Sequence, residues 1–162
     1  MKNKLWILLL FLLAPLFFGC QATTTYYQGA KADSQGVVRL AVDQVENQRW
    51  QDLYVTVDYS YDRQGDQFNI DGLFSFSFSP KINFERVRDL KLKLFLLDKD
   101  MFVVDYLEIA RTLSTSLEDQ ISFSYKLDLA ENVVAFTFGY EGSFIDDEGS
   151  GFTIWKLPKR NL

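Results

Sequence analysis

The fold of this chain is decided by the stretch Val55-Thr56-Val57-Asp58-Tyr59-Ser60-Tyr61. Apolar or aromatic side chains stand at every second position, and Thr, Asp and Ser stand between them. Successive side chains of a β-strand point to opposite faces of a sheet, so a period of two is typical of a strand. The stretch therefore predicts a strand with one face in a core and the other in solvent.

The same period recurs along most of the chain. Short segments rich in Asp, Asn and Gly separate the alternating stretches and read as hairpin loops. About seven or eight strands of this kind predict an all-β fold, an antiparallel β-sandwich that is either immunoglobulin-like or transthyretin-like. The expected strands cover residues 38–42, 55–61, 68–78, 90–96, 103–109, 121–127, 136–140 and 152–156.

Two features qualify this pattern. Phe95 and Leu97 interrupt the alternation of residues 90–96, so we expect that strand to be central in its sheet or covered by a loop. Helix is expected only in short pieces, such as 43–51 or 112–119.

The N-terminus carries the strongest motif. Lys2 and Lys4 precede an apolar run over residues 5–18, which is shorter than the roughly 20 residues of a transmembrane helix. The segment Leu16-Phe17-Phe18-Gly19-Cys20 then resembles the lipobox of bacterial lipoprotein signal peptides, although a branched aliphatic is commoner at the position of Phe17.

The resemblance implies that the Cys20 thiol takes a diacylglycerol, that cleavage falls between Gly19 and Cys20, and that the new amino group is acylated (palmitate or a similar chain). Two or more acyl chains anchor a protein stably to a membrane. The alternative is an uncleaved anchor that ends in a free, buried cysteine. Gln21 stands where an inner-membrane lipoprotein of enteric bacteria has Asp, so in a Gram-negative host we expect the outer membrane, facing the periplasm.

These boundaries give a lipoprotein signal peptide over residues 1–19, a lipidated flexible tether over 20–36, and a single β-sandwich domain over 37–162. Within the tether, Tyr26 and Tyr27 either rest at the membrane interface or pack on the domain.

The composition of the chain excludes several classes of function and partner. The formal net charge is −5, and loss of the two lysines in residues 1–19 makes it −7, which argues against nucleic acid as a partner and against extra electrostatic attraction to anionic lipid. The sequence holds no histidine, which excludes Ser-His-Asp and Cys-His catalysis and His-ligated metals. With a single cysteine, no intrachain disulfide forms. We expect no catalysis, no cofactor and no metal.

Several local clusters have both a functional and a structural interpretation. The loop Asp146-Asp147-Glu148 is either part of a calcium site or a solvated acidic turn, and Asp98 and Asp100 form a similar pair. The alternating Phe74, Phe76 and Phe78 face either an apolar ligand or the core.

Two further clusters lie far apart in the sequence or at its end. Trp50, Tyr140 and Trp155 form a sugar-stacking platform, or Trp155 is a cap over the core. The basic segment 156–160 meets an acidic partner or a phosphate headgroup, or is a solvated tail.

The sequence thus predicts a non-catalytic, lipid-anchored envelope protein that binds or helps to assemble another envelope protein. The alternative is a binding module for a lipid, glycan or other small ligand. A carboxylate-dependent hydrolase is a third hypothesis, and it needs two acids that converge in one pocket.

Overall fold

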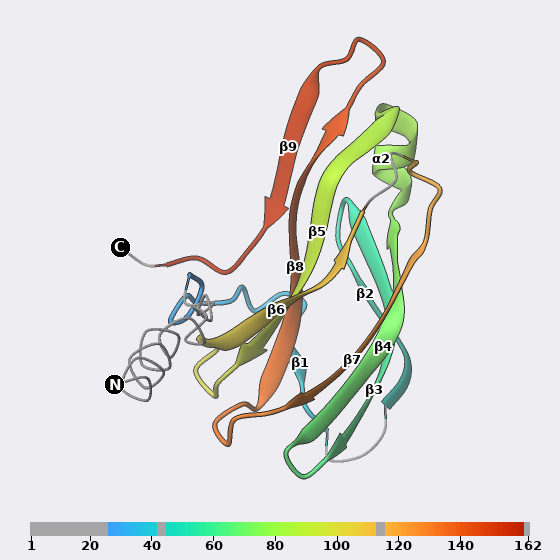
Figure 1. The fold of residues 1–162 in the computed structure, drawn as a ribbon. Coiled ribbons are helices and arrows are strands. Elements are labelled where there is room, and N and C mark those ends of the chain that lie inside the picture. Colours follow the sequence, from blue (N-terminus) through green and yellow to red (C-terminus); the bar gives the residue numbers. More distant parts are fainter. Residues whose placement is uncertain (1–25, 42–44, 113–115, 161–162) are drawn as a thin grey trace, which may run out of the picture.

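The computed structural model describes residues 26–41, 45–112 and 116–160. It confirms the all-β sandwich, with nine strands and one short helix in the described residues (Figure 1). They are β1 (Val38–Arg39), β2 (Val45–Gln51), β3 (Val55–Gln64), β4 (Gln67–Phe76), α2 (Phe78–Asn83), β5 (Arg86–Leu97), β6 (Val103–Arg111), β7 (Ile121–Asp128), β8 (Ala135–Ile145) and β9 (Gly151–Lys156).

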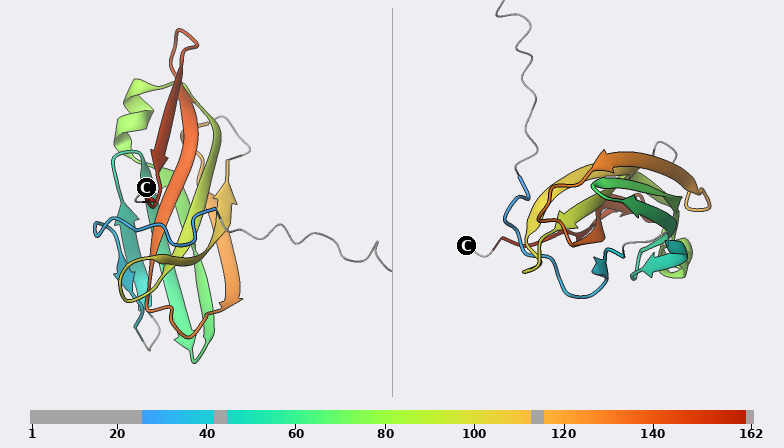
Figure 2. Two further views of the ribbon diagram at one scale, coloured as in Figure 1. Left: turned by 90° about the vertical axis from the view of Figure 1, so that its left-hand side faces the viewer. Right: turned by 90° about the horizontal axis from the view of Figure 1, so that it is seen from below.

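The strands form two antiparallel sheets, which Figure 2 shows from two further sides. One has the order β2-β3-β4-β7. The other has the order β1-β8-β5-β6, and β9 pairs with β8 beyond the two residues of β1. Strands β6 and β7 also approach each other, so one side of the sandwich is partly closed.

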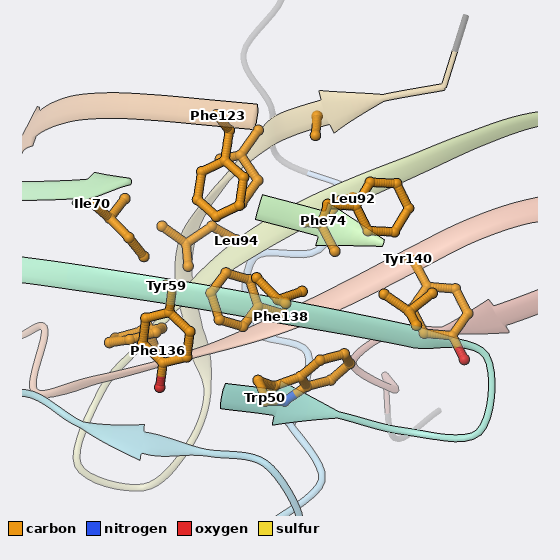
Figure 3. Packing of buried hydrophobic residues seen from close by; sticks show 14 of the residues in the cluster. Trp50, Tyr59, Ile70, Phe74, Leu92, Leu94, Phe123, Phe136, Phe138 and Tyr140 are labelled. Carbon is orange, nitrogen blue, oxygen red and sulfur yellow. The ribbon is translucent and has the colours of Figure 1, made fainter. Parts of the chain in front are cut away.

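The main core fills the space between the sheets, as Figure 3 shows. The alternating residues of the deciding stretch, Val55, Val57, Tyr59 and Tyr61, are all buried there. The Tyr59 ring lies 5.1 Å from that of Phe138 and 5.8 Å from that of Phe136 between ring centroids. Aromatic rings from facing strands thus fill the core, as the period of two predicts.

A second apolar cluster lies on the other side of β5 and β8, outside the sandwich. We call it the outer cluster. It is built from Phe95 and Leu97 of β5 together with residues of the segment 27–32 that cover them. The prediction that this strand is central or covered is confirmed, because β5 lies between β8 and β6 and also carries this cover. The buried members are Tyr27, Ala30, Ala32, Phe95, Leu97, Val103 and Ala135.

This cover corrects the expected boundary at residue 37. Tyr27 packs on the domain, the Gly29 N–H donates to Val103 O, and the Ala32 N–H donates to Met101 O. The domain therefore begins by Tyr27, and of the expected flexible tether only residues 20–25 lie outside the described residues. Burial of apolar side chains holds the segment, which its polar composition did not reveal.

The C-terminal basic segment is docked in the same region. Lys31 and Lys159 exchange two backbone hydrogen bonds of 2.8 and 2.9 Å, and Leu157 packs against the outer cluster. The interpretation of this segment as a solvated tail is therefore wrong for residues 157–159. The two ends of the described chain lie side by side (Figure 1).

The helix predictions need correction as well. Residues 45–51 form strand β2, and the part of 112–119 that is described holds only a turn. The helix is α2 instead, and it cuts the expected strand 68–78 short at Phe76. Pro80 lacks the N–H that a strand ladder uses, but it fits the first turn of a helix.

Candidate functional site

The lipobox residues, Gly19 and Cys20 included, lie outside the described residues. Within the part of the chain that the structure describes, no helix has the length and apolar character needed to cross a membrane. Membrane attachment through Cys20 therefore stays a prediction from the sequence.

The acidic loop Asp146-Asp147-Glu148 closes the β8–β9 hairpin. The Asp146 carboxylate accepts the Ser150 N–H at 2.7 Å, and the Asp146 carbonyl accepts the Gly149 N–H at 3.1 Å. These are the bonds of an Asp-capped turn. Among the described residues, no three acids or cysteines are grouped so as to hold a metal ion.

Asp98 has the same structural role in the β5–β6 turn. One of its carboxylate oxygens accepts the N–H groups of Asp100 and Phe102, each at 2.9 Å. Of the two interpretations of Asp98 and Asp100, the structure therefore supports the acidic turn.

The predicted aromatic platform does not form. Trp50 and Tyr140 are buried in the main core, whereas Trp155 on β9 is 60% exposed. Trp155 is not a cap over the core, because it lies on the outer face of its sheet. Phe74 and Phe76 also belong to the core, but Phe78 is exposed on α2.

A partly buried polar network fixes the β2–β3 turn. The Tyr140 hydroxyl donates to one Asp52 oxygen at 2.5 Å, and the other Asp52 oxygen accepts the N–H groups of Tyr54 and Val55. Burial raises the pKa of Tyr140 far above its usual range, and the hydrogen bond and charge of Asp52 raise it further. Bonds within the domain thus occupy the Asp52 carboxylate, and its role here is structural.

A hollow of about 780 Å³ lies where the two ends of the described chain meet, on the outer face of the sheet that contains β5 and β8. We call it the terminal hollow. Tyr26 and Trp155 border it with exposed rings, and Lys159 and Arg160 border it with positive charge. Thr153, Ile154, Leu157, Pro158, Tyr27, Tyr106, Lys93 and Glu141 complete its lining.

A lysine–glutamate pair forms the floor of the terminal hollow. The Lys93 ammonium lies 2.6 Å from a Glu141 oxygen, 4.9 Å from the centroid of the Tyr27 ring and 5.9 Å from that of Tyr106. Lys93 is only 7% exposed, so a carboxylate and the faces of two rings replace the water around its charge.

This environment acts on the pKa of Lys93 in two opposite directions. Burial lowers the pKa, but the hydrogen bond and charge of Glu141, with a smaller contribution from Tyr27, raise it above the ordinary lysine value. Burial has the opposite effect on Tyr27, whose pKa it raises, because the charged form of tyrosine is the deprotonated one. Lys93 is therefore charged at neutral pH and is held as a structural cation.

Helix α2 and the β8–β9 hairpin lie at the same end of the sandwich (Figure 1), and these elements and the nearby β2–β3 turn carry four exposed apolar side chains. We call this group the apolar tip. The Ser77 N–H donates to Tyr54 O, which holds the start of α2 beside the β2–β3 turn. The members and their exposed fractions are Phe78 (75%), Ile82 (63%), Leu53 (61%) and Phe152 (49%), with the Phe152 ring stacked on that of Phe84.

Strand β9 is an edge strand that starts at the apolar tip. Its six residues pair with β8 without a register shift, and in the described part of the chain it pairs with no other strand. Edge strands usually carry bulges or charges that prevent further pairing. Lys156, at its end, is the single charged residue of β9.

Strand β2, an edge strand of the other sheet, is protected in the usual way. A register shift lies between Val45 and Gln48, and Asn47 has a φ of 53°. Glu46 and Arg49 expose charge along the same strand. A second regular edge, β7, carries Lys126 and Asp128 and has β6 beside it.

Another hollow, of about 250 Å³, lies over β2, β3 and β4. It is lined by the acids Glu46, Asp62 and Asp71 together with Asn47, Ser60, Tyr61 and Asn69. The Asp62 carboxylate accepts a hydrogen bond from the neighbouring Gln64 side chain. Nothing else in the described structure marks this surface as a site.

The sequence reasoning missed the Lys93–Glu141 pair and the apolar tip. Lys93 is one of the regular lysines between leucines, and such a position normally faces solvent. Ile82 and Phe78 belong to a helix that the alternating pattern obscured.

No protein-family model matches the chain, and neither a curated protein nor a solved structure matches it. The finer fold class, immunoglobulin-like or transthyretin-like, stays a prediction. Function is therefore argued from the residues and surfaces described above.

Proposed function

We propose that this chain is a lipid-anchored envelope protein whose domain binds another envelope protein without catalysing a reaction. The observation that carries the proposal is the apolar tip next to an edge strand without bulge or central charge. Such an edge accepts a further strand through main-chain hydrogen bonds, and adjacent apolar side chains add specificity.

The lipobox-like segment supports the location. Lipidation at Cys20, after cleavage behind Gly19, holds the domain at a membrane surface in the cell envelope, and in a Gram-negative host this is the outer membrane facing the periplasm. Replacement of Cys20 by serine (Cys20→Ser) is expected to abolish fatty-acid labelling and leave unprocessed precursor. Labelling that persists in this variant contradicts the anchor.

The partner surface is tested by mild cross-linking in intact envelopes, followed by purification of the tagged, lipidated protein. We expect a stoichiometric partner that is lost in Phe78→Ser/Ile82→Ser and in Phe152→Lys. The matched controls are Leu73→Ser/Val134→Ser and Tyr125→Lys, which make the same kinds of change at other exposed apolar residues. Equal recovery of the partner from all these variants contradicts the proposed surface.

A second candidate function, binding of a lipid or another small ligand, is favoured by the terminal hollow. Its volume lies in the range of ligand pockets, and two exposed aromatic rings border it. This hollow lies on the outside of the sandwich. Within the described part of the chain, the space between the sheets offers no room for a ligand, because side chains fill it.

A further inference from the structure

We infer that the terminal hollow is a binding surface for anionic phospholipid headgroups of the membrane that holds the lipid anchor. The inference deepens the proposed function and rests on the anchoring at Cys20. It concerns a surface other than the apolar tip, so the two proposals are tested by different residues.

The charge of the hollow differs from that of the whole protein. The chain is acidic, with a net charge of −5, but the hollow holds three cationic side chains and one carboxylate. Glu141 is already paired with Lys93. Lys159 and Arg160 are both exposed, and Arg160 also donates a hydrogen bond to Gln28 O, so the lining of the hollow carries more positive than negative charge.

Positive charge continues beyond the hollow. A neighbouring hollow of about 570 Å³ shares Trp155, Leu157 and Lys159 with it and adds Lys31 and Lys156. Of the two carboxylates there, Asp52 is engaged by Tyr140, and Asp33 accepts the Gln35 N–H. Cationic side chains thus outnumber carboxylates in this second hollow too, by three to two.

Aromatic side chains accompany these cations. Trp155 and Tyr26 are 60% and 73% exposed, although rings of this size are usually buried. An aromatic ring with one polar atom is stable at the boundary between lipid headgroups and acyl chains. Exposed Trp and Tyr side chains beside Lys and Arg are therefore more favourable against a phospholipid surface than in bulk water.

The position in the chain selects this occupant over an acidic protein. Tyr26 borders the hollow and lies six residues after Cys20, so even a fully extended connection reaches only about 20 Å. A domain anchored at Cys20 thus keeps the terminal hollow close to the bilayer. Backbone bonds between Lys31 and Lys159 hold the basic C-terminal segment on the same side.

Tryptophan fluorescence tests the inference on the purified, lipidated protein. The protein is inserted into vesicles of phosphatidylcholine, or of phosphatidylcholine with phosphatidylglycerol, whose acyl chains carry bromine as a quencher. We expect quenching of Trp155 in the vesicles with phosphatidylglycerol and its loss in Lys159→Glu/Arg160→Glu. Trp155→Phe assigns the signal, because Trp50 is buried.

The matched control is Arg63→Glu/Lys126→Glu, which makes the same change in charge on the other sheet and is expected to keep the quenching. Equal signals in both kinds of vesicle, from protein that is labelled with fatty acid, overturn the inference and leave the anchor intact. Absence of labelling overturns the anchor instead. A change produced equally by inorganic phosphate shows binding of a free anion and also overturns the inference.

A photo-reactive amino acid in place of Trp155 separates a lipid from a protein occupant in intact envelopes. Cross-links to phospholipid support the inference. Cross-links to an acidic protein in place of phospholipid contradict it.

Discussion

The main core and the outer cluster lie on opposite faces of the same sheet, but they are closed in different ways. Two sheets with alternating side chains enclose the main core, and aromatic rings from both meet in it. The outer cluster is closed on one side by a strand surface and on the other by the irregular segment 27–32. The same strand, β5, contributes Leu94 to the first and Phe95 to the second.

The difference shows what each cluster requires of the chain. The main core depends on strand pairing over most of the domain, so a change there acts on global stability. The outer cluster depends on the docking of a terminal segment whose backbone hydrogen bonds to the rest of the domain come from the four residues 29–32. We therefore expect the outer cluster to open without unfolding of the sandwich, and three substitutions test this contrast.

The largest effect is expected from Phe138→Ala in the main core. The Phe138 ring contacts the rings of Trp50, Tyr59, Phe123 and Phe136, so its loss leaves a cavity that the sheets cannot close. We expect a loss of about 3–5 kcal/mol in the free energy of unfolding, measured by urea denaturation. A loss below about 1 kcal/mol contradicts the assignment of the ring to the main core.

A smaller effect is expected from Tyr27→Ala in the outer cluster. The Tyr27 ring packs edge-on against Phe95 and Tyr106 and lies beneath the Lys93 ammonium. We expect a loss of about 2 kcal/mol, with faster amide hydrogen exchange confined to the covered part of β5. The control Tyr26→Ala, at an exposed ring, should change stability little. If Tyr27→Ala lowered the free energy of unfolding as much as Phe138→Ala, the two clusters would unfold as one cooperative unit, contrary to this expectation.

The smallest effect is expected from Glu141→Gln, which removes the charged partner of Lys93. Since the Glu141 side chain is 38% exposed, solvent screens part of the pair, and we expect a loss of about 1 kcal/mol at neutral pH. Unfolding by urea measures this change as well.

The pH dependence gives the sharper test of that pair. In the native protein the raised pKa of Lys93 adds stability below the ordinary lysine pKa, and this stability is lost as the pH rises through the raised value. Without Glu141, burial dominates and the pKa falls, so the deficit of the variant should shrink as the pH rises from about 8 to 11. A deficit that does not change with pH contradicts this account. The double variant Lys93→Met/Glu141→Gln should show no such dependence.

Much of the fold was predictable from the alternation of residue types. Tyr59 and Phe74 follow the pattern and are buried as expected, because a sheet with one solvated face requires a period of two. Pro80 marks the place where the pattern failed, since alternation of Phe and Ser continues into a helix. At Phe95 and Leu97 the interruption of the pattern correctly indicated a cover, but not which segment supplies it.

The candidate sites were less predictable. Asp98 and Asp146 cap turns, and this role follows from local hydrogen bonding alone, which neighbouring residues in the sequence decide. Lys93 and Glu141 are 48 residues apart, and the sequence around either residue gives no indication that the two side chains pair.

The sequence by itself determined the alternating strands, the turns between them, the acidic charge and the lipobox-like segment that ends at Cys20. The net charge is a sum over the composition, and the other features depend on residues within about one strand or one turn of each other. The tertiary structure decided the order of the sheets, the docking of both chain ends, the exposed tip and the unprotected edge of β9. Burial and edge pairing depend on which distant segments meet, and that is fixed only when the whole domain packs.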